Sequence, residues 1–238
     1  MLLAVLFSLI LTQPPKALGC DWNVPANYRS VIIRKRVRYF KPKIIALTFD
    51  DGPSSANTPR ILQTLKMHHA HATFFILGCQ AKLHPELVKQ IADDGHAIGI
   101  HTYTHSRHPS PSQAENEISR TAALLKSITG RSTQLFRPPY GNTHSSYTRN
   151  ALKRRYAVIL WTVSSADTAT HDRKMVLNNV TLGVNPGDIV LMHDSEDKRQ
   201  TMEALPTVLD RLANKGFTLV TIPELLTAWD KKNTTKPK

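Results

Sequence analysis

The sequence predicts an α/β fold in which parallel strands alternate with helices. Seven short apolar segments recur along the chain, and an amphipathic helical pattern follows each of them. Its 238 residues suit a single domain, and a hydrophobic content of 41% is enough to form a buried core. A closed arrangement of such units is a TIM-like barrel, and an open one is a doubly wound sheet.

The expected strands are runs of apolar and β-branched residues at 44–49, 72–77, 96–100, 134–136, 156–162, 188–192 and 217–222. The expected helices lie near 57–68, 85–94, 112–128, 146–154, 172–180, 198–214 and 223–229. In the first helix Ile61, Leu62 and Leu65 fall on one face. In the second, Pro85 suits the first helical position and Gly95 suits the stop.

The first residues resemble an export signal. Leu2–Leu11 is an almost wholly apolar run, and its roughly ten residues are too few to span a bilayer, which needs about 20. The length suits the core of a signal peptide, with Ala17 and Gly19 as the small residues of a cleavage site. No Lys or Arg precedes the run, and a buried N-terminal helix is the alternative. We expect a signal peptide over 1–19 and an exported protein, either secreted, periplasmic or associated with the cell envelope.

The chain has two cysteines, Cys20 and Cys79. In an oxidising compartment they can form a disulfide. Alternatively, Cys20 is a lipid-modified first residue after cleavage, or both thiols are free. The sequence leaves these three possibilities open.

The formal charge of +13 points to an anionic partner, either nucleic acid or a cell wall or membrane surface. Much of this charge lies in a basic segment, 20–43, in which the stretches 31–33 and 37–40 suit short strands and a solvated arm is the alternative. The last residues, 230–238, form a basic tail that we expect to be disordered. No nucleic-acid recognition motif accompanies the charge, so we expect an anionic cell wall and no nucleic acid as partner.

Polar side chains follow five of the predicted strands, and chemistry in α/β folds occurs at the carboxyl ends of strands. These ends carry Asp50 and Asp51, the stretch from His101 to His105, the stretch from Arg137 to Gly141, the stretch from Trp161 to Asp167, and the pair His193 and Asp194. Acid–base and metal-binding residue types at five strand ends predict an active site.

His101 and His105 are four residues apart, which places both imidazoles on one face of a helical turn. Two histidines and one carboxylate form a familiar zinc-binding set that leaves positions open for water and substrate. A second histidine group, His68, His69 and His71, precedes a strand. It therefore belongs at the opposite face, where we expect surface residues.

The adjacent Asp50 and Asp51 would repel each other unless a cation binds one of them. One aspartate can then ligate the metal, while the other takes a proton from an attacking water. His193 is the candidate general acid. Asp167 is the candidate partner that keeps it protonated.

Several motifs in order, "TFDDGP", "ATFFILG", "HTYTH", "FRPPYG" and "DIVLMHD", resemble those of the NodB-type polysaccharide deacetylases, the carbohydrate esterases of family 4. The resemblance extends over about residues 44–228, within a deacetylase domain expected at 44–229. It implies a single-domain, distorted (β/α)₇ TIM-like barrel, which agrees with the seven predicted strands.

The resemblance also implies a role for each matching residue. Asp50 matches the catalytic base, Arg137 the arginine that orients it, His193 the general acid and Asp167 the partner of that acid. Asp51, His101 and His105 match the metal ligands, and the metal is expected to be a single divalent cation, Zn²⁺. Tyr140 matches the residue whose backbone N–H holds the oxyanion, and Leu191 matches an apolar wall for the acetyl methyl group.

Three positions depart from the family pattern. Ser164 stands where an earlier Asp is usual, Thr168 where a Trp is usual, and Ile100 where Asn commonly precedes the first histidine. These departures affect the walls of the pocket and a hydrogen bond behind the ligands.

The expected reaction is metal-dependent removal of N-acetyl groups from N-acetylglucosamine units of peptidoglycan or a chitin-type glycan. The alternatives are an O-acetyl esterase acting on xylan and a non-catalytic glycan-binding protein on the same fold.

Overall fold

A computed structural model of the chain describes residues 22–234. The predicted signal peptide, Cys20 and the last four residues of the predicted tail lie outside the described residues. None of the helices within the described part combines the length and apolar character needed to cross a membrane.

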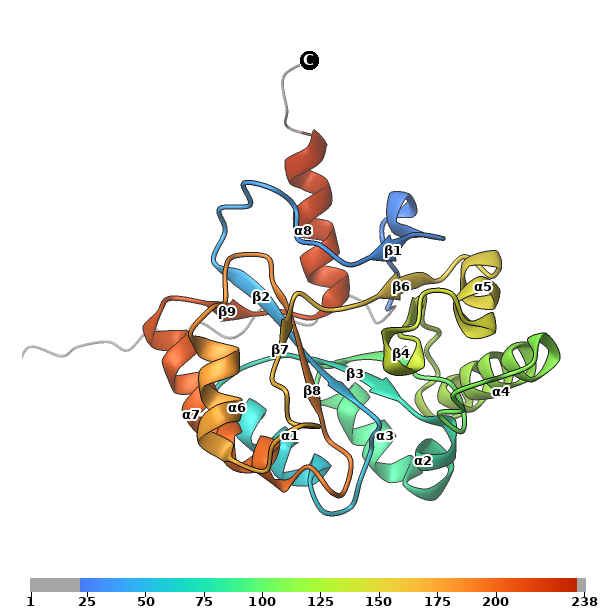
Figure 1. Ribbon diagram of the computed structural model, residues 1–238, viewed down its shortest axis with the longest axis horizontal. Coiled ribbons are helices and arrows are strands. Elements are labelled where there is room, and N and C mark those ends of the chain that lie inside the picture. Colours follow the sequence, from blue (N-terminus) through green and yellow to red (C-terminus); the bar gives the residue numbers. More distant parts are fainter. Residues whose placement is uncertain (1–21, 235–238) are drawn as a thin grey trace, which may run out of the picture.

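A curved sheet of parallel strands forms the centre of the molecule, and helices pack around it (Figure 1). In chain order the strands are β1 (Ile32–Ile33), β2 (Ile44–Asp50), β3 (Thr73–Ile76), β4 (Ala97–Ile100), β5 (Leu135–Phe136), β6 (Ala157–Ile159), β7 (Val163–Ser164), β8 (Ile189–His193) and β9 (Thr218–Leu219). Their order in the sheet is β1-β6-β5-β4-β3-β2-β8-β7, and β9 pairs with the start of β2. This arrangement is a distorted (β/α)₇ barrel, as predicted, and it is left open between β1 and β7.

The helices are α1 (Thr58–Met67), α2 (Gly78–Leu83), α3 (Pro85–Asp93), α4 (Pro111–Thr129), α5 (Ser146–Lys153), α6 (Arg173–Thr181), α7 (Arg199–Asn214) and α8 (Ile222–Thr234). Two 3₁₀ turns, Ala26–Tyr28 and Pro139–Gly141, complete the described elements. The bounds of α1 and α3–α7 agree with the predicted helices to within one residue at each end.

The longest helix, α4, shows why these agreements occur. The Ser110 hydroxyl accepts a hydrogen bond from the Gln113 N–H, Pro111 occupies the first turn, and Gly130 ends the helix with φ 73°. Each is a local signal for a helix start or stop, and each is readable from sequence.

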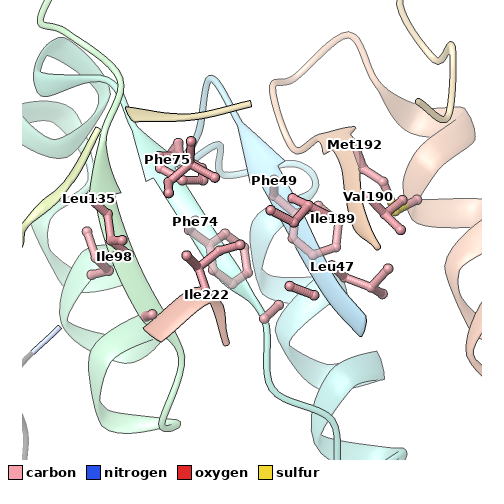
Figure 2. Packing of buried hydrophobic residues seen from close by; sticks show 14 of the residues in the cluster. Leu47, Phe49, Phe74, Phe75, Ile98, Leu135, Ile189, Val190, Met192 and Ile222 are labelled. Carbon is pink, nitrogen blue, oxygen red and sulfur yellow. The ribbon is translucent and has the colours of Figure 1, made fainter. Parts of the chain in front are cut away.

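The centre of the sheet is buried on both faces, so its strands are mostly apolar. The rings of Phe49 and Phe74 stack with their centroids 5.0 Å apart. Figure 2 shows these rings among Leu47, Ile98 and Ile189, which come from neighbouring strands of the sheet. The core fixes the relative positions of the strand ends, and therefore of the side chains that follow them.

Four predicted features differ in the structure. The strand expected at 156–162 ends early, at Ile159 of β6, and a separate strand, β7, begins at Val163, because β6 pairs with β5 and β1 whereas β7 pairs with β8. The stretch 37–40 is not a strand, because Tyr39 has a left-handed φ of 57°. The solvated-arm alternative is wrong for β1, which pairs with β6. Helix α8 continues to Thr234, so the first residues of the predicted disordered tail are helical.

Candidate active site

The acidic pair lies at the end of β2, where the chain turns sharply. Asp50 is the last residue of the strand, is 3% exposed and lies in register with His193 of β8. Asp51 has a left-handed φ of 74°, which turns the chain out of the strand direction. At Gly52 a Cβ atom would lie 2.1 Å from a carboxylate oxygen of Asp194, so only glycine allows this close approach.

Asp51, His101 and His105 bring one ligand atom each to a common point, and these three atoms lie within 4.8 Å of one another. The Oδ1 atom of Asp51 is 3.3 Å from His101 Nε2 and 3.5 Å from His105 Nε2. The His101 Nδ1–H donates to the Arg137 carbonyl at 2.7 Å, which leaves its Nε2 as the acceptor facing Asp51.

The charges of these groups favour a cation. Burial alone would raise the pKa of Asp51, but the neighbouring imidazoles lower it, so its carboxylate is ionised. Burial lowers the pKa of His105, which favours its neutral, metal-binding form. The buried Asp51 Oδ1 has no hydrogen-bond donor, although it faces two ring nitrogens. A divalent cation fits this set of two nitrogen ligands and one oxygen ligand.

The two histidines do not lie on a helical turn, contrary to the prediction. The segment from His101 to His105 is a loop in which Thr102 and His105 have positive φ values of 70° and 60°. Helix α4 holds this loop: a Glu117 carboxylate oxygen accepts from the Tyr103 and Thr104 N–H groups at 3.0 Å each. Two histidines four residues apart can therefore face a common metal site from a loop, without a helical turn.

Arg137 connects Asp50 to the opposite side of the barrel. Its guanidinium is fully buried and donates to Asp50 Oδ1 and to the Thr48 hydroxyl, both at 2.7 Å. The same group donates to the carbonyls of Ile159 and Leu160, where the chain leaves β6. These bonds fix one Asp50 oxygen and leave Oδ2, 3.9 Å from His101 Nε2, facing the candidate metal site.

His193 and Asp167 form the second polar pair. His193 Nδ1–H donates to Asp167 Oδ1 at 2.8 Å, and the His193 backbone N–H donates to Oδ2 at 2.8 Å. The Thr201 hydroxyl also donates to Oδ2, at 2.6 Å. Burial alone would lower the pKa of His193, but the hydrogen bond and charge of Asp167 raise it to about 9. His193 is therefore an imidazolium at neutral pH.

Tyr140 and Leu191 border the same space. Tyr140 lies in the Pro139–Gly141 turn with φ 59°, and its ring centroid is 4.6 Å from that of His105. The Arg107 guanidinium covers the outer side of this ring at 3.9 Å. Leu191 is two residues before His193 on β8, so both side chains point to one face of the strand.

The positions that depart from the family pattern lie around this set. Ile100 is fully buried at the end of β4, and its carbonyl accepts from the Arg137 N–H at 2.9 Å. Ser164 and Thr168 are both exposed.

The structure brings all nine predicted site residues to the carboxyl ends of the strands. The predicted surface histidines precede β3 at the other end, where His69 is exposed and His68 and His71 are partly buried.

Two supporting residues were not predicted: Thr48 binds Arg137, and Glu117 holds the histidine loop. A polar residue inside an apolar pattern could have indicated a supporting role for both. Thr48 interrupts the apolar run of β2, and Glu117 lies on the buried face of α4. Asp194, expected at a strand end but without a role, lies under Gly52, where burial and nearby carboxylates raise its pKa to about 7.

Comparisons with known proteins agree with the geometry. A family model described as polysaccharide deacetylase matches residues 38–158. A peptidoglycan-N-acetylglucosamine deacetylase of Bacillus cereus is 37% identical over 210 residues, which cover 86% of this chain and 92% of that protein. The structure of peptidoglycan deacetylase PdaC from Bacillus subtilis has a TM-score of 0.75 and 31% identity, covering 81% of this chain and 94% of that chain.

A family 4 carbohydrate esterase pseudoenzyme from Bacillus anthracis is also similar. Its TM-score is 0.72 with 30% identity, and the match covers 79% of this chain and 66% of that chain. A mutant of that protein is described as having restored enzymatic activity. The shared fold therefore includes both active and inactive members.

Proposed function

The chain belongs to the polysaccharide deacetylase family of hydrolases, carbohydrate esterase family 4, and we propose that it removes N-acetyl groups from N-acetylglucosamine units of peptidoglycan. The observation that carries this proposal is the convergence of a candidate metal triad, an arginine-bound carboxylate and an imidazolium at the carboxyl ends of the parallel strands. The products are acetate and a glucosamine unit.

Asp51, His101 and His105 are the proposed ligands of one divalent cation, most simply Zn²⁺, because nitrogen and carboxylate donors suit this ion. The chemistry that such a cation supplies when bound is Lewis-acid activation of the amide carbonyl and of the attacking water.

Asp50 is the proposed base. Its Oδ1 is bound by Arg137, so Oδ2 is the oxygen that accepts the proton of the water as the new carbon–oxygen bond forms. His193 is the proposed acid: because Nδ1–H is bound to Asp167, its Nε2–H can protonate the amine nitrogen as the carbon–nitrogen bond breaks. In this proposal the Tyr140 N–H stabilises the oxyanion, and Leu191 receives the acetyl methyl group.

Peptidoglycan is favoured over chitin and xylan because the two deacetylases named above act on peptidoglycan according to their names. The formal charge of +13 also favours association with an anionic wall. A wall substrate requires action outside the cytoplasm, and the apolar run Leu2–Leu11 supports export.

The test is acetate release from peptidoglycan, chitooligosaccharides and acetylated xylan, with and without a chelator. We expect release from peptidoglycan, lost with chelator and restored by Zn²⁺. We expect Asp51→Ala to lose bound metal, whereas Asp50→Asn keeps the metal and loses activity. An active Asp50→Asn protein rules out the proposed base.

A non-catalytic glycan-binding protein is the second candidate, because a related pseudoenzyme has the same fold. Binding to peptidoglycan without metal-dependent acetate release from any of the three glycans would favour this candidate.

A further inference from the structure

The segment 29–43 is the most basic part of the chain. It carries seven Lys and Arg residues and no Asp or Glu. Six of the seven are exposed: Arg34, Lys35, Arg36, Arg38, Lys41 and Lys43. We name the surface formed by these six residues the basic pole.

The basic pole is a fixed part of the fold. Strand β1 pairs with β6 on one side of it, and Phe40 is buried in the core on the other. Arg36 forms an ion pair with the buried Asp188 at 3.2 Å. The Lys232 ammonium of α8 donates to the Arg38 carbonyl at 2.6 Å. The charges are therefore presented in a defined arrangement on one surface.

Within this surface, the part from Arg36 to Lys43 lies at the end of the barrel opposite the active site, whereas Arg34 and Lys35 directly follow β1. Lys43 immediately precedes β2 and Asp188 immediately precedes β8, whereas Asp50 and His193 end these strands. Figure 1 shows the segment between β1 and β2 beside α8, at the end away from the loops that follow β2 and β8. At ~3.3 Å per residue, β2 separates the two ends by roughly 20 Å. That is more than twice the screening length of about 8 Å in physiological salt, so the charge of Lys43 has little influence on the reaction.

Apolar and aromatic side chains project among the charges. Tyr39 is 82% exposed, Val31 is 38% exposed, and the Arg38 guanidinium is 5.8 Å from the centre of the Tyr39 ring. Tyrosine beside basic residues is typical of the membrane–water interface, where the ring lies at headgroup level. A soluble polyanion would need the charges but not the exposed ring.

The preceding part of the chain reaches the barrel at this same end. Trp22 forms a parallel bridge with Thr133, just before β5, and its indole N–H donates to the carbonyl of His96, just before β4. Trp22, the first described residue, therefore lies at the same end of the barrel as Lys43.

We propose that the basic pole docks on an anionic lipid headgroup surface and thereby directs the active site away from the membrane, toward the glycan. This inference adds an attachment surface to the proposed deacetylase and does not depend on catalysis. Each cation near such a surface contributes about a five-fold gain in binding.

The experiment measures binding of the full chain to phosphatidylcholine vesicles with and without phosphatidylglycerol. The ratio of the two affinities is the readout, because any contribution of Leu2–Leu11 is common to both. The test variant replaces Arg34, Lys35, Arg38 and Lys41 with Gln. The control variant replaces Arg60, Lys89, Arg173 and Lys174 with Gln, which removes the same charge from exposed positions outside the basic pole.

We expect the wild type and the control variant to prefer anionic vesicles and to be released by salt. Because four cations are removed, the test variant should lose this preference by roughly several hundred-fold. Tyr39→Ser should weaken vesicle binding several-fold. Acetate release from a soluble oligosaccharide should be unchanged in every variant, which separates failure of docking from failure of the proposed function.

Equal losses in the test and control variants would show that net charge alone drives binding and would overturn the proposal. Wild-type binding to purified cell wall that depends on the four cations, without any preference for anionic vesicles, would assign the basic pole to a wall polymer instead.

Discussion

Replacing Asp167 with Asn tests the link between this carboxylate and the proposed acid, His193. In the structure both oxygens of Asp167 accept hydrogen bonds from His193, one from the ring and one from the backbone. Asn keeps the shape of the side chain but removes its charge. Burial, which alone lowers the pKa of His193, is then no longer opposed by the carboxylate.

The magnitude follows from the pKa of His193. Its rise from an ordinary value of 6.5 to about 9 corresponds to about 3 kcal/mol in favour of the imidazolium. In the variant we expect the pKa to fall to 6.5 or below. At pH 8 the protonated fraction then drops from about nine-tenths to a few per cent, so a rate that requires the acid falls at least about 30-fold.

The assay is acetate release from a soluble N-acetylglucosamine oligomer between pH 5.5 and 10. The alkaline limb of the profile should move to lower pH by two units or more in Asp167→Asn. It should stay in place in Asp197→Asn, which removes an exposed carboxylate from a nearby loop. A bound cation displaces both profiles in one direction, so the difference between variants is the quantity to compare. Identical alkaline limbs in wild type and Asp167→Asn would refute the assignment of His193 and its partner.

The same pair predicts a pH-dependent stability. Because the pKa of folded His193 is raised, the pair stabilises the folded state fully below about pH 6.5 and loses this contribution as the pH rises through about 9. Urea unfolding at pH 6 and pH 10 should therefore differ more for the wild type than for Asp167→Asn.

Arg137→Met leaves the buried Asp50 carboxylate without its partner, so the free energy of unfolding should fall by about 3–5 kcal/mol in urea titrations; a loss under about 1 kcal/mol would contradict the buried pair. Burial lowers the pKa of His96 to about 3, so the wild type should lose stability as the pH falls from about 6.5 to 3, whereas His96→Gln should show a flatter acid limb in pH-dependent unfolding. Gly52→Ala should reduce bound metal and activity, because its Cβ would lie 2.1 Å from a buried carboxylate oxygen. Gly183→Ala, with open space around its Cβ position, should leave both metal content and activity at wild-type levels.

Local patterns predicted most of the fold. The apolar run of β2 and the capping residues of α4 act within a few positions of the chain, so their signals survive in a single sequence. The break between β6 and β7 depends on which distant strand each half pairs with, which no local pattern records. Helix α2 was missed because it is six residues long and is separated from α3 by a single residue.

The site was predictable to the extent that strand order brings strand ends together. Asp50 and His193 are adjacent because β2 and β8 pair, and both residues follow from the rule that chemistry lies at carboxyl ends. The backbone of the histidine loop was not predictable, because positive φ values at Thr102 and His105 depend on contacts with α4. The contact between Asp194 and Gly52 could not be predicted either, because the two residues are more than a hundred positions apart in the sequence.

The two strands at the ends of the sheet order are short, and this has a consequence for the solubility of the open barrel. The outer strands β1 and β7 are two residues long each, so neither offers a long row of unpaired N–H and C=O groups to a second chain. The cations at Arg34 and Lys35 directly follow β1 and add charge repulsion between copies at that edge. Short, charged edges are how natural sheets avoid pairing with one another. The barrel can therefore remain unclosed without growing into aggregates by strand addition.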